Sequence, residues 1–332
     1  MEFFVKRFSD LTTTELYALL HVRNQVFVVE QDCVYQDLDF HDQEAIHVWL
    51  QDDNGNILAL SRICPAGGHM ERVSIGRMIT TVRGKGYGLQ VMRLAIKVAK
   101  IYFNPEYIDI EAQEYAKEFY EKVGFEQSSD SFILDGIPHI KMTYHFNNQI
   151  RVRKADLGDV NLIANVVCMA LGEEQAEKLR GGVGIETLEQ VVADPNTVYS
   201  YKNSLVAEVN CEPLGAIISY DGAKMWELRG PAFDIIERNS GVRPQLEEET
   251  QAGECYLDSV AVMPNFRGMG IGSMLIQEAA NRAFEAGFEK VALLVDADNP
   301  NAEKLYTRLG FKRDNPVTLL GHEMWHMVLC NF

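Results

Sequence analysis

The sequence lacks the features that would place the chain in a membrane or an oxidising compartment. It contains no run of about 18 apolar residues, so no membrane-spanning helix is expected. Its six cysteines are scattered and form no C-x-x-C pair, which indicates reduced thiols and not a disulfide framework. The stretch from Met1 to Arg7 lacks the apolar core of a signal peptide. These absences predict a cytoplasmic protein.

Positive charge is also scarce. The chain has 31 Lys and Arg against 48 Asp and Glu, a net charge of −17, and both halves are acidic. A nucleic-acid partner therefore has no electrostatic support, whereas a cationic amine would suit such a surface. The length of 332 residues and the 47% apolar content suit two globular domains that each bury a core.

Two glycine-rich turns are the most informative feature of the chain. Each follows a strand-like apolar run and precedes a helix-like run, so its backbone N–H groups and the helix dipole can hold an anion such as a pyrophosphate. The basic residue precedes the glycines and no G-K-[ST] follows, unlike Rossmann and Walker motifs. The first turn consists of Arg83, Gly84, Lys85, Gly86, Tyr87 and Gly88, and the second of Arg267, Gly268, Met269, Gly270, Ile271 and Gly272.

A second landmark repeats with the turns. Residues 119–125 (FYEKVGF) recur as 305–311 (LYTRLGF), at nearly the same distance from the preceding turn. This spacing predicts a duplicated domain and not a short-period repeat. A polar break near residue 148 divides the chain into residues 1–147 and 148–332, and the second half carries an inserted acidic segment near 221–253. Such an insertion suits an ordered element at a substrate mouth or a surface loop.

The order of elements in each half resembles the GNAT superfamily of acyl-CoA-dependent N-acyltransferases. The first half is similar to its ElaA-like branch, through residues 26–33 (VFVVEQDC) and 135–139 (DGIPH), and the second half to a generic GNAT domain. The resemblance implies an α+β fold with two GNAT-type domains. In each, helices flank a mixed, mostly antiparallel sheet whose central strand pair is splayed.

The resemblance also implies acetyl-CoA as the acyl donor. The two turns would hold its pyrophosphate, and the splayed strands would hold the pantetheine through backbone groups. Those backbone groups belong to Met78 and Ile79 in the first half and to Val260 and Val262 in the second. Asn299 matches a CoA-contacting position of the family, where the first half has Gln113 instead.

The expected reaction is transfer of acetyl to a primary amine of a small molecule or peptide. In the family, a helix tyrosine protonates the departing thiolate, a role that falls to Tyr120 and Tyr306. The amine must also lose a proton to a base. Glu254 and Asp258 lie at alternate positions of one strand, so they are candidates to face the substrate together. In the first half, Glu30, His41, Glu44 and His47 are the candidates.

Two alternatives stay open from the sequence. One half could be a silent acyl-CoA-binding or structural module, although both tyrosines are present, and a sensor without catalysis is a third possibility. Residues 322–326 (HEMWH) match the H-E-x-x-H zinc pattern. That pattern requires a helix, whereas the following residues are strand-like, so we expect a strand and no metal.

Overall fold

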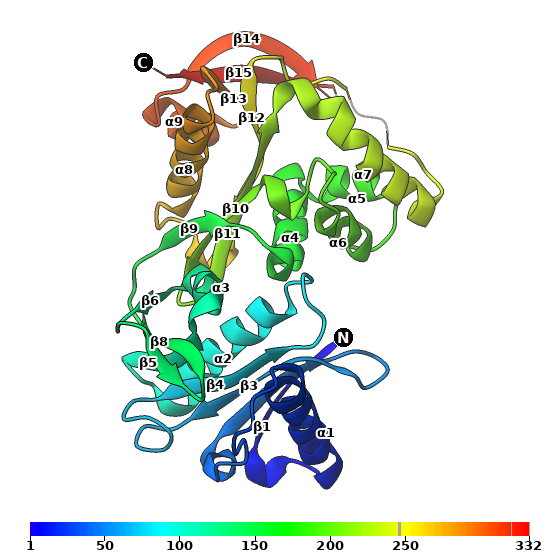
Figure 1. Ribbon diagram of the computed structural model, residues 1–332. Coiled ribbons are helices and arrows are strands. Elements are labelled where there is room, and N and C mark those ends of the chain that lie inside the picture. Colours follow the sequence, from blue (N-terminus) through cyan, green and yellow to red (C-terminus); the bar gives the residue numbers. More distant parts are fainter. Residues whose placement is uncertain (245–246, 320, 332) are drawn as a thin grey trace. The chain divides into compact units, whose positions relative to one another are not determined.

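The computed structural model describes residues 1–244, 247–319 and 321–331. The chain divides into two compact units, Met1–Asn148 and a second one from Gln149 onward. Each unit contains one mixed sheet with helices against it, which confirms the predicted α+β class (Figure 1). Among the described residues, no helix is both long and apolar enough to cross a membrane.

The sheet of the first unit has the order β1-β2-β3-β4-β5-β8-β6, with β7 also paired to β8. All neighbours are antiparallel except β4 and β5, which are parallel. The strands are β1 (Glu2–Arg7), β2 (Ile46–Gln51), β3 (Ile57–Cys64), β4 (Ser74–Thr80), β5 (Tyr107–Gln113), β6 (Phe125–Gln127), β7 (Phe132–Leu134) and β8 (Ile137–His145). The helices are α1 (Thr13–Arg23), α2 (Tyr87–Phe103) and α3 (Lys117–Val123).

Helix α1 begins where the sequence places a cap. The Thr12 hydroxyl accepts a hydrogen bond from the N–H of Glu15, and the Glu15 carboxylate accepts one from the N–H of Thr12. The α-helix ends at Arg23, where the chain widens into a π-helical segment, Asn24–Glu30. Its wider turns are shown by bonds such as Gln31 N–H to the Val26 carbonyl, 3.1 Å.

The sheet of the second unit repeats this plan in the order β14-β15-β13-β12-β11-β10-β9. Again one parallel pair, β12 and β13, lies at its centre. The strands are β9 (Arg151–Lys154), β10 (Ser204–Val209), β11 (Glu212–Asp221), β12 (Glu254–Val262), β13 (Lys290–Asp296), β14 (Lys312–Leu319) and β15 (His322–Cys330). The helices are α4 (Val160–Leu171), α5 (Glu173–Arg180), α6 (Glu186–Ala193), α7 (Met225–Ser240), α8 (Ile271–Glu285) and α9 (Pro300–Arg308).

Apolar side chains cover both faces of the second sheet. The core on one face, which packs against α4, α6 and α7, includes Val166, Phe233 and Tyr256. The core on the opposite face, which packs against α8, includes Leu275 and Leu257. Helix α7 occupies part of the inserted segment and buries an apolar stripe in the first of these cores, so this part of the insertion is an ordered element of the fold.

Candidate active sites in the two units

The parallel strand pair at the centre of each sheet is paired over only part of its length. In the first unit the pairing of β4 with β5 consists of Ser74 with Asp109. In the second, β12 pairs with β13 only from Glu254 to Tyr256. The later residues of β4 and β12 keep their antiparallel neighbours but diverge from the parallel one. Their backbone groups on that side are therefore available to an extended ligand.

A β-bulge lies where each strand pair parts. In β4 the register shifts opposite Leu60–Arg62, and Arg77 takes the left-handed backbone conformation, φ 52°. In β12 the shift lies opposite Ile218–Ser219, next to Asp258. A bulge bends the strand and changes where its side chains point. Both units therefore have the same backbone irregularity beside the gap.

The two glycine turns have matching backbone conformations. Gly84 and Gly86 have φ of 77° and 75°, and Gly268 and Gly270 have 80° and 79°. Gly86 and Gly270 are also the N-caps of α2 and α8. Left-handed residues alternating with right-handed or extended ones direct successive N–H groups into one concavity, which suits a phosphate.

The arginines of the two turns have different partners. Arg83 forms an ion pair with Glu30 of the π-helical segment, and both side chains are largely exposed. Arg267 donates from Nε to the Val262 carbonyl at 3.2 Å. Lys85 and Met269 are exposed on the turns. An arriving pyrophosphate would have to compete with Glu30 for Arg83, whereas no carboxylate pairs with Arg267 among the described residues.

Each candidate tyrosine is a phenol in an apolar setting. Tyr120 lies on α3 against Phe119 and Phe125, with ring centroids 4.9 and 6.0 Å away. Tyr306 lies on α9, 6.1 Å from the ring of Phe311. Burial raises the pKa of both hydroxyls above the ordinary value of 10, so both are protonated at neutral pH. Neither hydroxyl has a hydrogen-bond partner among the described residues, so each is free to donate.

The two amide candidates already take part in local contacts. The Gln113 side chain forms reciprocal hydrogen bonds with Gln31, at 3.2 and 3.4 Å. The Asn299 side chain caps α9 by accepting from the N–H of Ala302 at 3.2 Å. Capping uses only the oxygen of the Asn299 amide, so its two N–H donors remain for a ligand.

The surroundings of Asp258 raise the pKa of its carboxyl group. It is held by the hydroxyls of Tyr220, at 3.0 Å, and Ser259, at 2.8 Å. Burial raises its pKa above 3.8, and the opposing hydrogen bond from Ser259 and the charge of Arg229 do not cancel that effect. A carboxylate with a raised pKa is a better proton acceptor than one in water.

Glu254 has a different environment from Asp258. Its Oε2 lies 3.1 Å from His326 Nε2, and its Oε1 accepts from the N–H of Gln251 at 2.8 Å. The other ring nitrogen of His326 is 3.3 Å from Asp314. The hydrogen bond with Glu254 raises the pKa of His326, against the opposing effect of burial. The carboxylate of Glu254 is thus engaged by a buried histidine.

The H-E-x-x-H residues lie on β15, which confirms the predicted strand. In a strand, positions i and i+4 are roughly 13 Å apart, too far to bind one ion together. His322 lies 3.8 Å from Asp296, whereas His326 contacts Glu254.

An acidic stretch of the first unit, residues 37–42 between α1 and β2, is neutralised within the fold. Arg23 bonds Asp37 at 2.9 Å and Asp42 at 2.6 Å, and Asp42 also lies 3.2 Å from Arg62. The side chains of the two arginines are each only 2% exposed. These carboxylates therefore stabilise buried arginines and are not free surface charges that could bind a cationic substrate. Nothing in the sequence signals which arginine each would meet.

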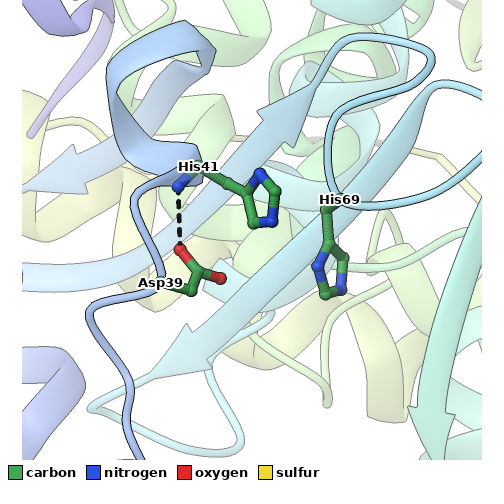
Figure 2. A group of neighbouring side chains, drawn as sticks. All are labelled: Asp39, His41 and His69. Carbon is green, nitrogen blue, oxygen red and sulfur yellow. Dashed lines mark hydrogen bonds between the residues drawn. The ribbon is translucent and has the colours of Figure 1, made fainter.

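Asp39 is the third member of this network and lies beside two imidazoles (Figure 2). Ligand atoms of Asp39, His41 and His69 lie within 4.8 Å of one another, a spacing that could suggest a metal site. However, Asp39 Oδ1 accepts from Arg62 and from the N–H of His41, and Oδ2 accepts from Arg62 and Arg77. The four acceptor positions of a carboxylate are thereby filled, so a cation would have to displace an arginine.

Comparison with known proteins identifies both units. The model of the acetyltransferase (GNAT) domain matches residues 13–146, and that of the acetyltransferase (GNAT) family matches residues 185–311. A UPF0039 protein of Schizosaccharomyces pombe is 37% identical over 145 residues, which are 43% of this chain and 95% of that protein. The chain belongs to the GNAT acetyltransferase family. It is an N-acetyltransferase, and its family generally uses acetyl-CoA.

The ElaA-like resemblance of the first GNAT unit is confirmed as well. Protein ElaA of Escherichia coli is 36% identical over 140 residues, 40% of this chain and 90% of ElaA. The crystal structure of Escherichia coli ElaA aligns with a TM-score of 0.41 and 32% identity, covering 44% of this chain and all of that one.

A crystal structure described as an acetyltransferase aligns with a TM-score of 0.47 and 32% identity, covering 54% of this chain and 98% of that one.

Proposed function

We propose that this protein transfers acetyl from acetyl-CoA to a primary amine of a small molecule or peptide, by direct attack through a tetrahedral intermediate. The observation that carries the proposal is the double occurrence of one set: a diverging strand pair, a bulge, a left-handed glycine turn and a protonated tyrosine. Direct attack needs no covalent enzyme intermediate, only a held thioester, a base and an acid.

The turns would bind the pyrophosphate, and the diverging strands would bind the pantetheine. We assign phosphate binding to residues 83–88 and 267–272, because their N–H groups and helix N-termini favour an anion. We assign pantetheine binding to the backbone of Met78, Ile79, Val260 and Val262, which lie beyond the part of each strand that pairs with its parallel neighbour. The Val262 carbonyl already accepts from Arg267, so its N–H is the group available to the ligand.

Asn299 would donate to the cofactor from its amide N–H₂, which capping leaves available. Gln113 would first have to leave Gln31 or bind with it as a pair. We therefore expect the contact from Asn299 to contribute more to cofactor affinity than the one from Gln113.

In the second unit, Asp258 would accept the proton of the attacking amine, and Tyr306 would protonate the thiolate. The nitrogen–carbon bond forms as Asp258 takes the ammonium proton of the intermediate, and the carbon–sulfur bond breaks as sulfur receives the proton of Tyr306. Solvent then restores both groups. Glu254, engaged by His326, would hold the strand end and not transfer the proton itself.

The alternative is that one unit binds acyl-CoA without catalysis. The observation that favours it is the ion pair between Arg83 and Glu30, which the second unit lacks at Arg267 within the described residues. We expect calorimetric titration with acetyl-CoA to show two sites per chain, the first-unit site being weaker. Glu30→Gln should tighten that site, and Arg83→Ala and Arg267→Ala should each weaken one site. No binding would contradict the proposed function.

Turnover would be followed as free thiol released from acetyl-CoA with a panel of amines: spermidine, glucosamine and lysine. Tyr120→Phe and Tyr306→Phe each remove one phenolic proton while keeping the ring. If both units act, each variant loses part of the turnover, and the double variant loses about 100-fold or more. Tyr17→Phe, at an exposed position on α1, serves as the matched control. A double variant with full turnover would contradict the assignment of the tyrosines.

A further inference from the structure

His69 lies in the loop between β3 and β4, away from every motif that the sequence brings out. This loop is braced by hydrogen bonds from Gly67 N–H to the Met70 carbonyl, 2.9 Å, and from Gly68 N–H to the Pro65 carbonyl, 3.2 Å. His69 is accessible to solvent, and neither of its ring nitrogens has a hydrogen-bond partner among the described residues. Its ring centroid is 5.5 Å from that of His41 (Figure 2).

The neighbours of His69 place it at the gap between β4 and β5. A ring nitrogen of His69 lies within 4.8 Å of an oxygen of Asp39, and Asp39 accepts a hydrogen bond from Arg77 at 3.1 Å. Arg77 is the bulge residue of β4, beside the point where the two strands part. The charge of Glu111, on β5, also acts on the imidazole.

The surroundings of His69 favour the neutral form of its imidazole. Partial burial of the ring, and then the positive charges of Arg62 on β3 and Arg77 on β4, lower its pKa below 6.5. Glu111 and Asp39 act in the opposite direction but do not cancel this effect. Asp39 raises the pKa of His69 only weakly, because its carboxylate is already paired with Arg62 and Arg77. At neutral pH His69 is thus a neutral imidazole, in which one ring nitrogen keeps its hydrogen and the other can accept a proton.

We propose that His69 is the general base of the first unit, taking the proton of the primary amine beside the β4 bulge. This inference rests on the proposed acetyl transfer. The base of the first unit then differs from that of the second, which is a carboxylate. The difference arises because the carboxylates of Asp37 and Asp39 in the acidic stretch are already paired with arginines.

The step balances with groups already named. The neutral amine nitrogen attacks the thioester carbonyl, whose π pair moves onto oxygen, and the nitrogen of the resulting intermediate is positively charged and more acidic than the ammonium of the free amine. His69 takes that proton, the carbon–sulfur bond breaks, and sulfur leaves with the bonding pair and receives a proton from Tyr120. His69 then releases its proton to water and Tyr120 regains one. From the neutral amine the sum is amide and free CoA thiol with no net proton, and an amine that starts as its ammonium first loses one proton to water.

The test uses the full chain with Arg267→Ala and Tyr306→Phe, so that only the first unit can turn over. Thiol release is measured with the same three amines. In this background we expect His69→Ala to lower kcat about 100-fold or more, as loss of a general base does, and to remove the acidic limb of the pH profile. Added imidazole should restore part of the rate in His69→Ala and leave the parent unchanged.

His145→Ala is the matched control, since that histidine is exposed in the same unit and stacks on Tyr107, 4.6 Å away. It should keep full turnover. Loss of activity in His69→Ala without rescue by imidazole, or an unchanged rate, would overturn the role of His69. Turnover by the intact chain but none by the first-unit form would overturn it too. Absence of turnover in the intact chain would instead overturn the proposed function.

Discussion

Replacing Asp42 by asparagine should remove much of the stability of the first unit. The Asp42 side chain is 9% exposed, and its Oδ1 lies 2.6 Å from Arg23 and 3.2 Å from Arg62. Asparagine keeps the volume but removes the charge that the two guanidiniums share. Arg23 keeps Asp37 and Arg62 keeps Asp39, so neither arginine is left without a carboxylate.

The expected loss follows from the burial of both partners. Breaking a buried ion pair costs about 3–5 kcal/mol, and the remaining carboxylates place Asp42→Asn near the lower end, about 3 kcal/mol. Burial alone would raise the pKa of Asp42, but the hydrogen bonds and charges of Arg23 and Arg62 outweigh it and lower that pKa below 3.8. Its contribution to stability is therefore present above pH 3.8 and lost as pH falls through the folded-state pKa.

Urea unfolding followed by amide hydrogen exchange and mass spectrometry would report the two units separately, through peptides of β3 and β10. Asp42→Asn should lower the midpoint for β3 and leave that of β10 unchanged. Asp53→Asn, whose side chain is 90% exposed, is the control and should change neither. Equal midpoints for Asp42→Asn and Asp53→Asn would refute the reasoning.

Three further results are expected. Gly88→Ala should disrupt cofactor binding by the first unit, because the added Cβ would lie 2.5 Å from Thr80 Oγ1. Gly272→Ala should be tolerated, since the added Cβ would meet only Val262, at 3.9 Å. Calorimetry with acetyl-CoA compares the two variants. Asp258→Asn should abolish second-unit turnover yet not lower the melting temperature of that unit at pH 7, because the raised pKa means that the buried charge is destabilising above it. His326→Gln should flatten the pH dependence of second-unit stability. In the parent, the stabilisation contributed by protonated His326 is present below pH 6.5 and is lost as pH rises through its raised folded-state pKa. Thermal melts at a series of pH values measure this.

Much of the architecture can be predicted from local patterns in the sequence. The hairpin of β2 and β3 about the Asp53–Asn56 turn, the cap at Thr12 and the glycine turns before α2 and α8 depend on neighbours in sequence, so they could be predicted. The π-helical segment after Arg23 could not, because it continues the apolar pattern of a helix and differs only in how its hydrogen bonds close.

The candidate sites divide in the same way. The sequence alone indicated the two turns and the two tyrosines, since a duplicated spacing needs no knowledge of distant contacts. Only the tertiary structure decided which carboxylates are available. Asp258 is retained as a candidate base, Glu254 is engaged by His326 from another strand, and the acidic stretch before β2 is taken up by arginines. It also placed a ring nitrogen of His69 within 4.8 Å of Asp39, which accepts a hydrogen bond from Arg77 of the β4 bulge. Burial and charge pairing depend on residues far apart in the chain, and these determine whether an acidic or basic side chain can accept a proton.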